Sequence, residues 1–380
     1  MRIGVPAEIR QGETRVAATP ETIRKLTQGG RHVVLVETRA GLASSIADAD
    51  FEAAGATLVS TAASIYSQAD VVLKVRGPEA SELALLRPGT VVVGLLSPHD
   101  QPALEALARA GVTGFALEAV PRVTRAQTMD VLSSQANIAG YKAVLIAANA
   151  YGRFMPMLMT AAGTVKAARV LVLGAGVAGL QAIATARRLG AVVEAFDVRP
   201  AVKEQVESLG AKFVEVPVSD ADKSAAETTG GYARDMGDDY KRRQSALIDE
   251  RARASDIVIT TALIQGRQAP LLVPEATIRA MKPGSVIVDL AAQQGGNCAG
   301  TVPDAVVVVD GVTIVGHTNV PALVASDATT LYARNVLSFL NLLVDPASGA
   351  LRVDRTDEIV SATLVCAEGA PVRKQEATTA

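Results

Sequence analysis

The sequence predicts an α/β protein of two doubly wound domains, each with a parallel sheet between helices, separated by a cleft. The chain has 380 residues, which is long for a single hydrophobic core. It is 49% hydrophobic and 20% charged and contains 31 glycines, a composition typical of proteins with much buried sheet. Short β-branched runs also alternate with amphipathic helical patterns, which is the order of βαβ units.

The first third of the chain contains six β-branched runs that we interpret as strands. They are RIGVP, HVVLVET, ATLVS, DVVLKVR, TVVVGLL and VTGFALEAV. Between them lie segments such as PETIRKLTQGG and QPALEALARAG, with apolar residues three and four positions apart and glycine at the end. These elements predict the first sheet and its covering helices.

A second set of six runs predicts the second sheet. It consists of ARVLVLGAG, AVVEAFDV, AKFVEVP, SDIVITTA, GSVIVDLA and GVTIVGHT. A long helical stretch from about residue 126 to 150 joins the two sets, and the last helix, DATTLYARNVLSFLNLLV, is expected to return to the first domain. The expected domains are therefore residues 1–133 with 322–380, and residues 134–321. The residues after Cys366 are expected to form a loose tail.

One segment of the second domain breaks the alternation of strands and helices. Between residues 219 and 253, 15 of 35 residues are charged. Loops in such folds usually have about 2 to 6 residues, so an insertion of this length predicts either a disordered segment or a functional lid. Tyr232 follows two glycines there, and we favour a mobile loop near residues 219–240 that carries this aromatic ring.

The composition excludes several classes of function. The chain has no tryptophan, only 3% aromatic residues and a net charge of −2, so no nucleic-acid or anionic membrane surface is expected. Cys298 and Cys366 lack the spacing of a metal site or disulfide framework, which indicates a reducing compartment and no metal. No apolar run approaches the ~18 residues of a transmembrane helix, and no signal peptide is expected.

A glycine-rich turn gives the clearest functional signal. A strand leads into Gly174, Gly176 and Gly179 in the pattern GxGxxG, followed by a helix and a second strand that ends at Asp197. This is the Rossmann fingerprint, in which the glycines admit a pyrophosphate at the helix start and the acid accepts from a ribose. Asp197 favours NAD(H) over NADP(H), although the neighbouring Arg199 could counter that preference.

Polar residues crowd the segment RVTRAQTMDVLSSQANIAG at the expected domain boundary. Gln127, Asp130, Ser133, Ser134 and Asn137 follow helical spacing, with Met129, Leu132, Ala136 and Ala139 as an apolar stripe. One interpretation is a ligand face that binds a nicotinamide and its ribose. The other is a capping box from Thr124 to Gln127 with Asp130 as a first-turn acid, and the spacing does not decide between them.

Several motifs together resemble one protein family. They are MRIGVPAEIRQGETRVAATPETI, PRVTRAQTMDVLSSQANIAGY, LGAGVAGLQAIATARRLGA, KEQVESLGAKF, ETTGGYA, TTALIQGRQAP, KPGSVIVDLA and GGNC with VGHTNVPALVASDA. They resemble the NAD(H)-binding portion of the alpha subunits of proton-translocating NAD(P) transhydrogenases, which are related to alanine dehydrogenases. The resemblance implies hydride transfer from NADH to NADP⁺ on a partner subunit, coupled to proton translocation through membrane-embedded subunits.

The resemblance also implies site residues, partners and a location. It implies that Arg122, Gln127, Asp130 and Ser133 contact the nicotinamide and its ribose, with Arg122, Gln127 and Asp130 as the catalytic group. It further implies that Ala175, Gly176 and Val177 hold the pyrophosphate, that Asp197, Val198 and Arg199 surround the adenosine ribose, and that Gly231, Tyr232 and Leu263 close the site. Such subunits are homodimers without transmembrane segments, cytoplasmic and peripheral on the inner face of the membrane, facing an NADP(H)-binding domain.

Two alternatives stay open. The chain resembles alanine dehydrogenases in Arg15 and Lys74, the pair that binds pyruvate there, but Ser97 stands at the position of their histidine, with His99 two residues later. Gln293 or Gln294 replaces their acidic residue. Amino-acid oxidation requires a proton acceptor, whereas exchange between two nicotinamides requires none on this subunit. The second alternative is a non-catalytic NAD(H)-binding sensor.

Overall fold

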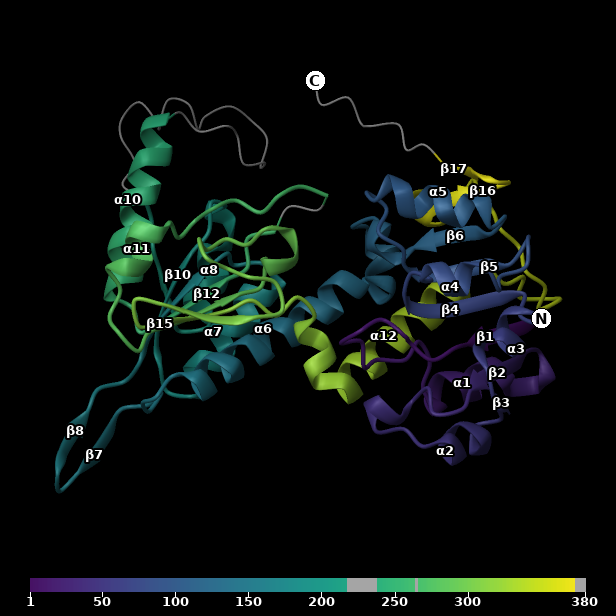
Figure 1. Ribbon diagram of the computed structural model, residues 1–380, viewed down its shortest axis with the longest axis horizontal. Coiled ribbons are helices and arrows are strands. Elements are labelled where there is room, and N and C mark those ends of the chain that lie inside the picture. The colour runs from purple at the N-terminus through teal and green to yellow at the C-terminus, as the bar shows by residue number, and fades with distance from the viewer. Residues whose placement is uncertain (217–237, 264–265, 373–380) are drawn as a thin grey trace. The chain divides into compact units, whose positions relative to one another are not determined.

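A computed structural model describes residues 1–216, 238–263 and 266–372 of the chain (Figure 1). Its contacts divide the chain into two compact units. Unit 1 comprises Met1–Gln135 and Pro321–Ala380, and unit 2 comprises Ala136–Val320. Each unit has its own sheet and its own cores on the two faces of that sheet.

The sheet of unit 1 has the strand order β17-β16-β6-β5-β4-β1-β2-β3. Six strands pair in parallel, and they are β1 (Arg2–Val5), β2 (Val33–Glu37), β3 (Thr57–Val59), β4 (Val71–Arg76), β5 (Val91–Leu95) and β6 (Thr113–Ala116). β16 (Leu364–Ala367) and β17 (Ala370–Pro371) add an antiparallel edge. Successive residues of β4 belong to different cores, Leu73 to one face and Val72 to the other, because side chains alternate along a strand.

Helices cover both faces of this sheet. They are α1 (Pro20–Thr27), α2 (Asp48–Ala53), α3 (Ala62–Tyr66), α4 (Ala80–Leu83), α5 (Gln101–Arg109), α12 (Ala325–Leu340) and α13 (Glu358–Thr363). α12 brings Tyr332 and Phe339 into the core of unit 1, where the Phe339 ring lies 5.5 Å from that of Phe115. The segment after the second sheet therefore completes the first core.

The sheet of unit 2 repeats this topology with the order β11-β10-β9-β12-β13-β15-β14. Its strands are β9 (Arg169–Leu173), β10 (Val192–Phe196), β11 (Lys212–Phe213), β12 (Ile257–Thr260), β13 (Val286–Asp289), β14 (Val306–Val309) and β15 (Val312–Val315). All pair in parallel except β14. The helices are α7 (Val177–Arg188), α8 (Lys203–Ser208), α10 (Asp238–Ala254), α11 (Glu275–Arg279) and the portion of α6 (Val131–Ala150) that lies in this unit.

A separate hairpin, β7 (Leu158–Thr160) with β8 (Gly163–Val165), projects away from the sheet of unit 2 (Figure 1). It carries exposed apolar side chains, since Met157 is 61% and Met159 is 72% exposed.

The predicted fold class, two doubly wound Rossmann-like domains, is confirmed. Each of the twelve predicted runs contains a strand. The predicted parallel sheets carry antiparallel strands only at their edges, where β14, β16 and β17 pair antiparallel among the described residues. Asp310 and Gly311 both have positive φ in the turn between β14 and β15, and an Asp-Gly pair between apolar runs is a strong hairpin signal that could have predicted this edge.

The charged segment of residues 219–253 is only partly an insertion. From Asp238 onward it forms α10, which buries Ile248 and Ala252 in a core of unit 2, so the prediction of a lid or disorder is wrong there. These two apolar residues lie four positions apart, which is the period of a helix, but the surrounding charges hide the pattern. The predicted mobile loop around Tyr232 lies, as far as Gly237, outside the residues that the structure describes.

Candidate functional site

The glycine-rich turn follows β9 at the carboxyl end of the sheet in unit 2. β9 lies between β10 and β12 there, and the strand order reverses at this point, where doubly wound folds bind ligands. Gly174 has a φ of 101°, a conformation that side-chain-bearing residues rarely adopt. A Cβ atom there would also lie 2.5 Å from Oγ1 of Thr261, whose hydroxyl donates to the Gly174 carbonyl. Only glycine fits this position.

The other two glycines of the motif have different surroundings. A Cβ on Gly179 would lie 1.8 Å from the carbonyl oxygen of Gly174, so Gly179 lets α7 pack directly against the turn. In the part of the chain that the structure describes, and apart from the chain neighbours of Gly176, the nearest atom to a Cβ on Gly176 would be a guanidinium nitrogen of Arg199 at 4.0 Å. Gly176 is also the N-cap of α7 and no side chain caps that helix, which leaves the first N–H groups and the helix dipole for an anion.

Asp197 follows β10 and is tied to the turn. Its Oδ2 accepts from the Ala175 N–H at 2.7 Å, and Arg199 donates to both carboxylate oxygens, through Nε at 3.0 Å and Nη2 at 2.9 Å. Partial burial by itself would raise the pKa of Asp197, but the hydrogen bonds from Arg199 and Ala175 and the charge of Arg199 hold it below the ordinary value. The carboxylate is therefore ionised at neutral pH.

Three exposed apolar side chains stand at the same end of the sheet. Val177 opens α7, Val198 follows β10, and Leu263 follows β12, and their exposures are 40%, 47% and 49%. Carboxyl ends of parallel strands meet at one edge, so these residues surround the turn. A ligand with anionic and aromatic groups would find N–H groups, a carboxylate and apolar contacts together.

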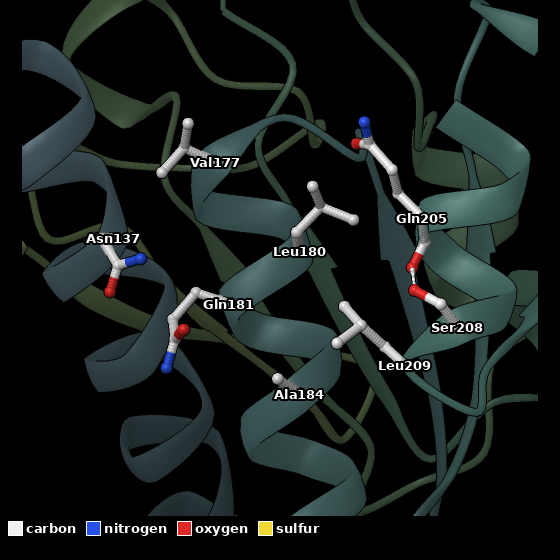
Figure 2. A pocket seen from close by; sticks show the side chains of 8 residues that line it. All are labelled: Asn137, Val177, Leu180, Gln181, Ala184, Gln205, Ser208 and Leu209. Carbon is white, nitrogen blue, oxygen red and sulfur yellow. Dashed lines mark hydrogen bonds between the residues drawn. The ribbon is translucent and has the colours of Figure 1, made fainter. Parts of the chain in front are cut away.

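A groove of about 350 Å³ runs along the flank of α7 (Figure 2). Its lining combines Val177, Leu180, Ala184 and Leu209 with Asn137, Gln181, Gln205 and Ser208. None of these eight side chains is charged, so the groove offers no side-chain cation to a phosphate. The anion-binding features lie at the start of α7.

The polar segment of residues 122–137 does not form one helix. Residues Thr124–Met129 are a 3-10 turn, η4, and α6 begins at Val131. Asp130 caps α6, since its Oδ1 accepts from the Ser133 N–H at 2.9 Å and its Oδ2 from the Ser133 hydroxyl at 2.6 Å. The predicted capping box from Thr124 to Gln127 is wrong, because no side chain caps η4.

The predicted apolar stripe is also wrong. Leu132 is 37% exposed, whereas Val131 and Ile138 are buried. The 3-10 turn and the cap at Asp130 change the register of every later residue relative to a helix that begins at Thr124. Leu132, Ala136 and Ala139 keep helical spacing within α6, but Leu132 is exposed and the buried Met129 belongs to the preceding turn, so the four residues do not form one buried stripe.

The structure divides the polar side chains of this segment into tied and free groups. Arg125 donates to Asp357 at 2.6 Å, Ser134 donates to Asn335 at 2.7 Å, and the Gln135 amide donates to the Ala328 carbonyl at 3.1 Å. Arg122 and Gln127 are exposed, and within the stretches of chain that the structure describes their side chains make no hydrogen bond. These two are available to a ligand.

A buried ionic cluster occupies the carboxyl ends of β1 and β4 in unit 1. Arg15 is 2% exposed and pairs with Glu13 at 2.6 Å, and Lys74 is 1% exposed and pairs with Glu82 at 2.7 Å and with Glu8 at 3.6 Å. Burial by itself would raise the pKa of Glu13, but hydrogen bonds and charge from Arg15, with the charge of Arg76, lower it to about 2. The sequence predicts only the two cations, because carboxylates eight positions from Lys74 or two from Arg15 form no motif.

The comparisons with known proteins decide the family. The sequence matches the family descriptions "Alanine dehydrogenase/PNT, N-terminal domain" over residues 4–139 and "Alanine dehydrogenase/PNT, C-terminal domain" over residues 143–374. It is 51% identical to the first part of the NAD(P) transhydrogenase alpha subunit from Rhodospirillum rubrum, over 98% of both chains. The chain belongs to the alanine dehydrogenase/PNT family.

Two further relatives place it within that family. A solved transhydrogenase structure from Sinorhizobium meliloti matches with a TM-score of 0.88 and 50% identity over 98% of this chain and 100% of that one. An alanine dehydrogenase from Mycobacterium tuberculosis is 34% identical over 80% of this chain and 76% of its own length. The resemblance to transhydrogenase subunits is thereby confirmed, and NAD(H) is the cofactor expected for this family.

Two positions separate the chain from the alanine dehydrogenase pattern predicted from the sequence. Ser97, at the position of the histidine, is exposed, has a φ of 55°, and donates its N–H to the half-buried Glu118 at 2.7 Å. Gln293, a candidate for the acidic position, is also exposed. Neither side chain can accept a proton at neutral pH.

Of the predicted site residues, those from Gly174 to Arg199 and Leu263 gather at one end of the sheet in unit 2, and Arg122, Gln127, Asp130 and Ser133 lie between β6 and the first turn of α6. Gly231 and Tyr232 lie outside the described residues. Among residues 1–216, 238–263 and 266–372, no helix is both long and apolar enough to cross a membrane. The same residues contain no group of three His, Cys, Asp or Glu side chains that could hold a metal ion.

Proposed function

We propose that this chain is the NAD(H)-binding component of a proton-translocating transhydrogenase. In this function a hydride passes from NADH on this chain to NADP⁺ on a partner subunit, and the proton pathway lies in membrane-embedded subunits. The observation that carries the proposal is the turn from Gly174 to Gly179 with Asp197 beside it, in a chain similar over nearly its whole length to a transhydrogenase subunit.

The turn is suited to a dinucleotide. The open side of Gly176 lets a pyrophosphate approach the backbone of the turn from Ala175 to Val177, and the uncapped N–H groups at the start of α7, including that of Val177, would donate to its oxygens. The Ala175 N–H is already donated to Asp197. Asp197 would accept from the adenosine ribose, and Val198 and Leu263 offer apolar contact to the adenine. The residues present therefore fit NAD(H).

The nicotinamide end is assigned to the polar segment. Arg122 can donate and Gln127 can both donate and accept, which suits a carboxamide, and Asp130 and Ser133 can contact the ribose hydroxyls. The bound nucleotide supplies the transferable hydride. The residues of this chain bind and orient it, and holding two reacting rings in near-attack contact removes several kcal/mol of the barrier, on the order of 7 in favourable cases.

An alanine dehydrogenase activity is the second candidate, supported by the presence of Arg15 and Lys74. Both cations are buried and paired with carboxylates, so a substrate carboxylate would have to displace Glu13, Glu8 or Glu82. The reaction also needs a proton acceptor, which Ser97 and Gln293 do not provide. These observations favour exchange between two nicotinamides.

The proposal includes partners and a location. The acceptor ring must reach the donor ring, so an NADP(H)-binding domain docks on this chain, and the chain is held at the inner face of the membrane by partner subunits. A homodimer is proposed because the hairpin of β7 and β8 projects with Met157 and Met159 exposed. Sedimentation should show a dimer that a Met157→Ser, Met159→Ser double variant weakens, and a monomeric wild type would refute the dimer.

One experiment tests the activity. The purified chain is mixed with an NADP(H)-binding transhydrogenase domain, and exchange between NADH and an NADP⁺ analogue is followed, while L-alanine with NAD⁺ is assayed in parallel. Exchange without alanine oxidation is expected. Alanine turnover without exchange would support the dehydrogenase instead, and tight NADH binding with neither reaction would support a sensor.

A further inference from the structure

The Asp197 carboxylate has no acceptor position left for a ribose. A carboxylate offers about four lone-pair directions. Four hydrogen bonds occupy them, because Oδ2 accepts from the Ala175 N–H and Arg199 Nη2, and Oδ1 accepts from the Arg199 N–H and Nε. A ribose hydroxyl can be accepted only if one of these donors leaves.

The donor that can leave is the guanidinium of Arg199. The two backbone N–H groups are fixed by the chain, and the Asp197 side chain is only 6% exposed. The Arg199 side chain is 46% exposed, so it can turn into solvent. Among the described residues other than the chain neighbours of Gly176, its Nη2 is the nearest heavy atom, at 4.0 Å, to the position that a Gly176 Cβ would take, so the guanidinium lies beside the open face of the turn.

We propose that Arg199 is an exchangeable partner of Asp197, which yields the carboxylate to ribose hydroxyls and thereby limits the chain's discrimination between NAD(H) and NADP(H). This inference rests on the proposed binding of NAD(H). An unpaired aspartate at this position repels a 2′-phosphate and accepts from free hydroxyls. The charge of Arg199 offsets the repulsion between Asp197 and a 2′-phosphate, and its guanidinium can pair with that phosphate. Asp197 alone therefore does not set the preference.

The test is the ratio of the NADPH to the NADH dissociation constant, measured by titration calorimetry on the full chain. Arg199→Ala removes the competitor for Asp197 and the cation for a 2′-phosphate, so the ratio should rise about tenfold or more, the worth of one charge-assisted hydrogen bond. Arg199→Lys keeps the positive charge without the fork and should keep NADPH affinity closer to that of the wild type.

Lys203→Ala is the matched control. Lys203 is an exposed cation four positions away, and it pairs with Glu215 at 2.7 Å. Loss of Lys203 should leave the ratio of the NADPH to the NADH dissociation constant within about twofold of the wild-type value. That result would show that a change in net charge alone does not alter the ratio. An unchanged ratio in Arg199→Ala, with NADH still bound, would overturn the role of Arg199. A wild-type chain that binds no NADH would instead overturn the proposed function.

Discussion

Alanine substitutions at Gly176 and Gly179 should affect different properties, although the residues lie three positions apart in one turn. The change at Gly179 should lower stability, and the change at Gly176 should weaken ligand binding. The added Cβ atom at Gly179 would lie 1.8 Å from the Gly174 carbonyl oxygen and 2.8 Å from its carbon. The added Cβ atom at Gly176 would lie 4.0 Å from the nearest heavy atom of any other described residue beyond its chain neighbours, which is the end of a flexible arginine. The first change perturbs the fold, and the second perturbs only the space where a pyrophosphate would lie.

The size of each effect follows from these contacts. Ordinary contact needs about 3.5 Å, so α7 would have to withdraw by roughly 1.5 Å in Gly179→Ala. Such overpacking lowers the free energy of unfolding by about 1 to 3 kcal/mol, or by more when the clash is with backbone atoms. The higher helix propensity of alanine offsets at most about 1 kcal/mol of this loss. A net loss of about 2 kcal/mol lowers the Tm of a unit of this size by roughly 4 to 8 °C.

Gly176→Ala should leave the Tm almost unchanged. Gly176 has φ −76° and ψ −167°, which alanine adopts without strain. The methyl group would instead displace a phosphate from N–H groups that each contribute about 1.5 to 3 kcal/mol in a charge-assisted bond. The loss of one such bond weakens NADH binding by about 10- to 100-fold.

Thermal unfolding without ligand and NADH titration of both variants make up the assay. Gly179→Ala should have a lowered Tm. Gly176→Ala should have a normal Tm and a weakened NADH affinity. Normal NADH affinity in Gly176→Ala would show that no pyrophosphate approaches this face, and a normal Tm in Gly179→Ala would show that the turn and α7 are not locked together.

Three further changes test other regions of the molecule. Gln127→Asn should slow NADH-to-NADP⁺ exchange far more than it weakens NADH binding and should leave the Tm unchanged, because this side chain is exposed and caps nothing; full exchange would contradict its proposed contact. Asp130→Ala should destabilise the chain to urea by about 0.5 to 2 kcal/mol, because it removes the cap of α6. A midpoint equal to that of the wild type would show that the cap is dispensable. Glu13 has its pKa lowered from 4.5 to about 2, so its contribution of roughly 3 kcal/mol is complete above pH 4.5 and is lost as the pH falls toward 2. Glu13→Gln should lower stability at pH 7, because it leaves Arg15 buried without this partner. It should also weaken the dependence of stability on pH below pH 4.5, and an unchanged dependence would refute the contribution assigned to Glu13.

The features that could be predicted from the sequence are those decided by neighbours in the chain. The glycine turn is one, because strand, turn and helix follow within a few residues and each glycine has a local steric cause. The parallel strands are another, because β-branched runs recur at regular intervals. The β14 edge is also decided locally, because Asp310 and Gly311 form a tight turn between two apolar runs, and turn chemistry predicts it where strand periodicity alone does not.

The features that could not be predicted depend on residues distant in the chain. The 3-10 turn before α6 is held by the bond from Arg125 to Asp357, 232 positions away, and by the bond from Asn335 to the Thr128 carbonyl, 207 positions away. Neither partner forms a local pattern with this segment. Thr124 and Asp130 are both residue types that cap helices, and the distant contacts support the conformation in which Asp130 is the cap.

These distant contacts also give the polar segment a functional meaning that spacing alone could not. Residues such as Arg125 and Ser134 are tied to other elements of unit 1, so substitutions there would disturb the fold and the activity together. Gln127 and Arg122 stand among them exposed and without a side-chain hydrogen bond to the described residues. Substitution of a polar side chain that supports no element of the fold can lower the activity of the protein without lowering its stability. A variant at Gln127 with a normal Tm and slow exchange would therefore report on the nicotinamide itself, whereas the same result at a tied neighbour would not separate the two causes.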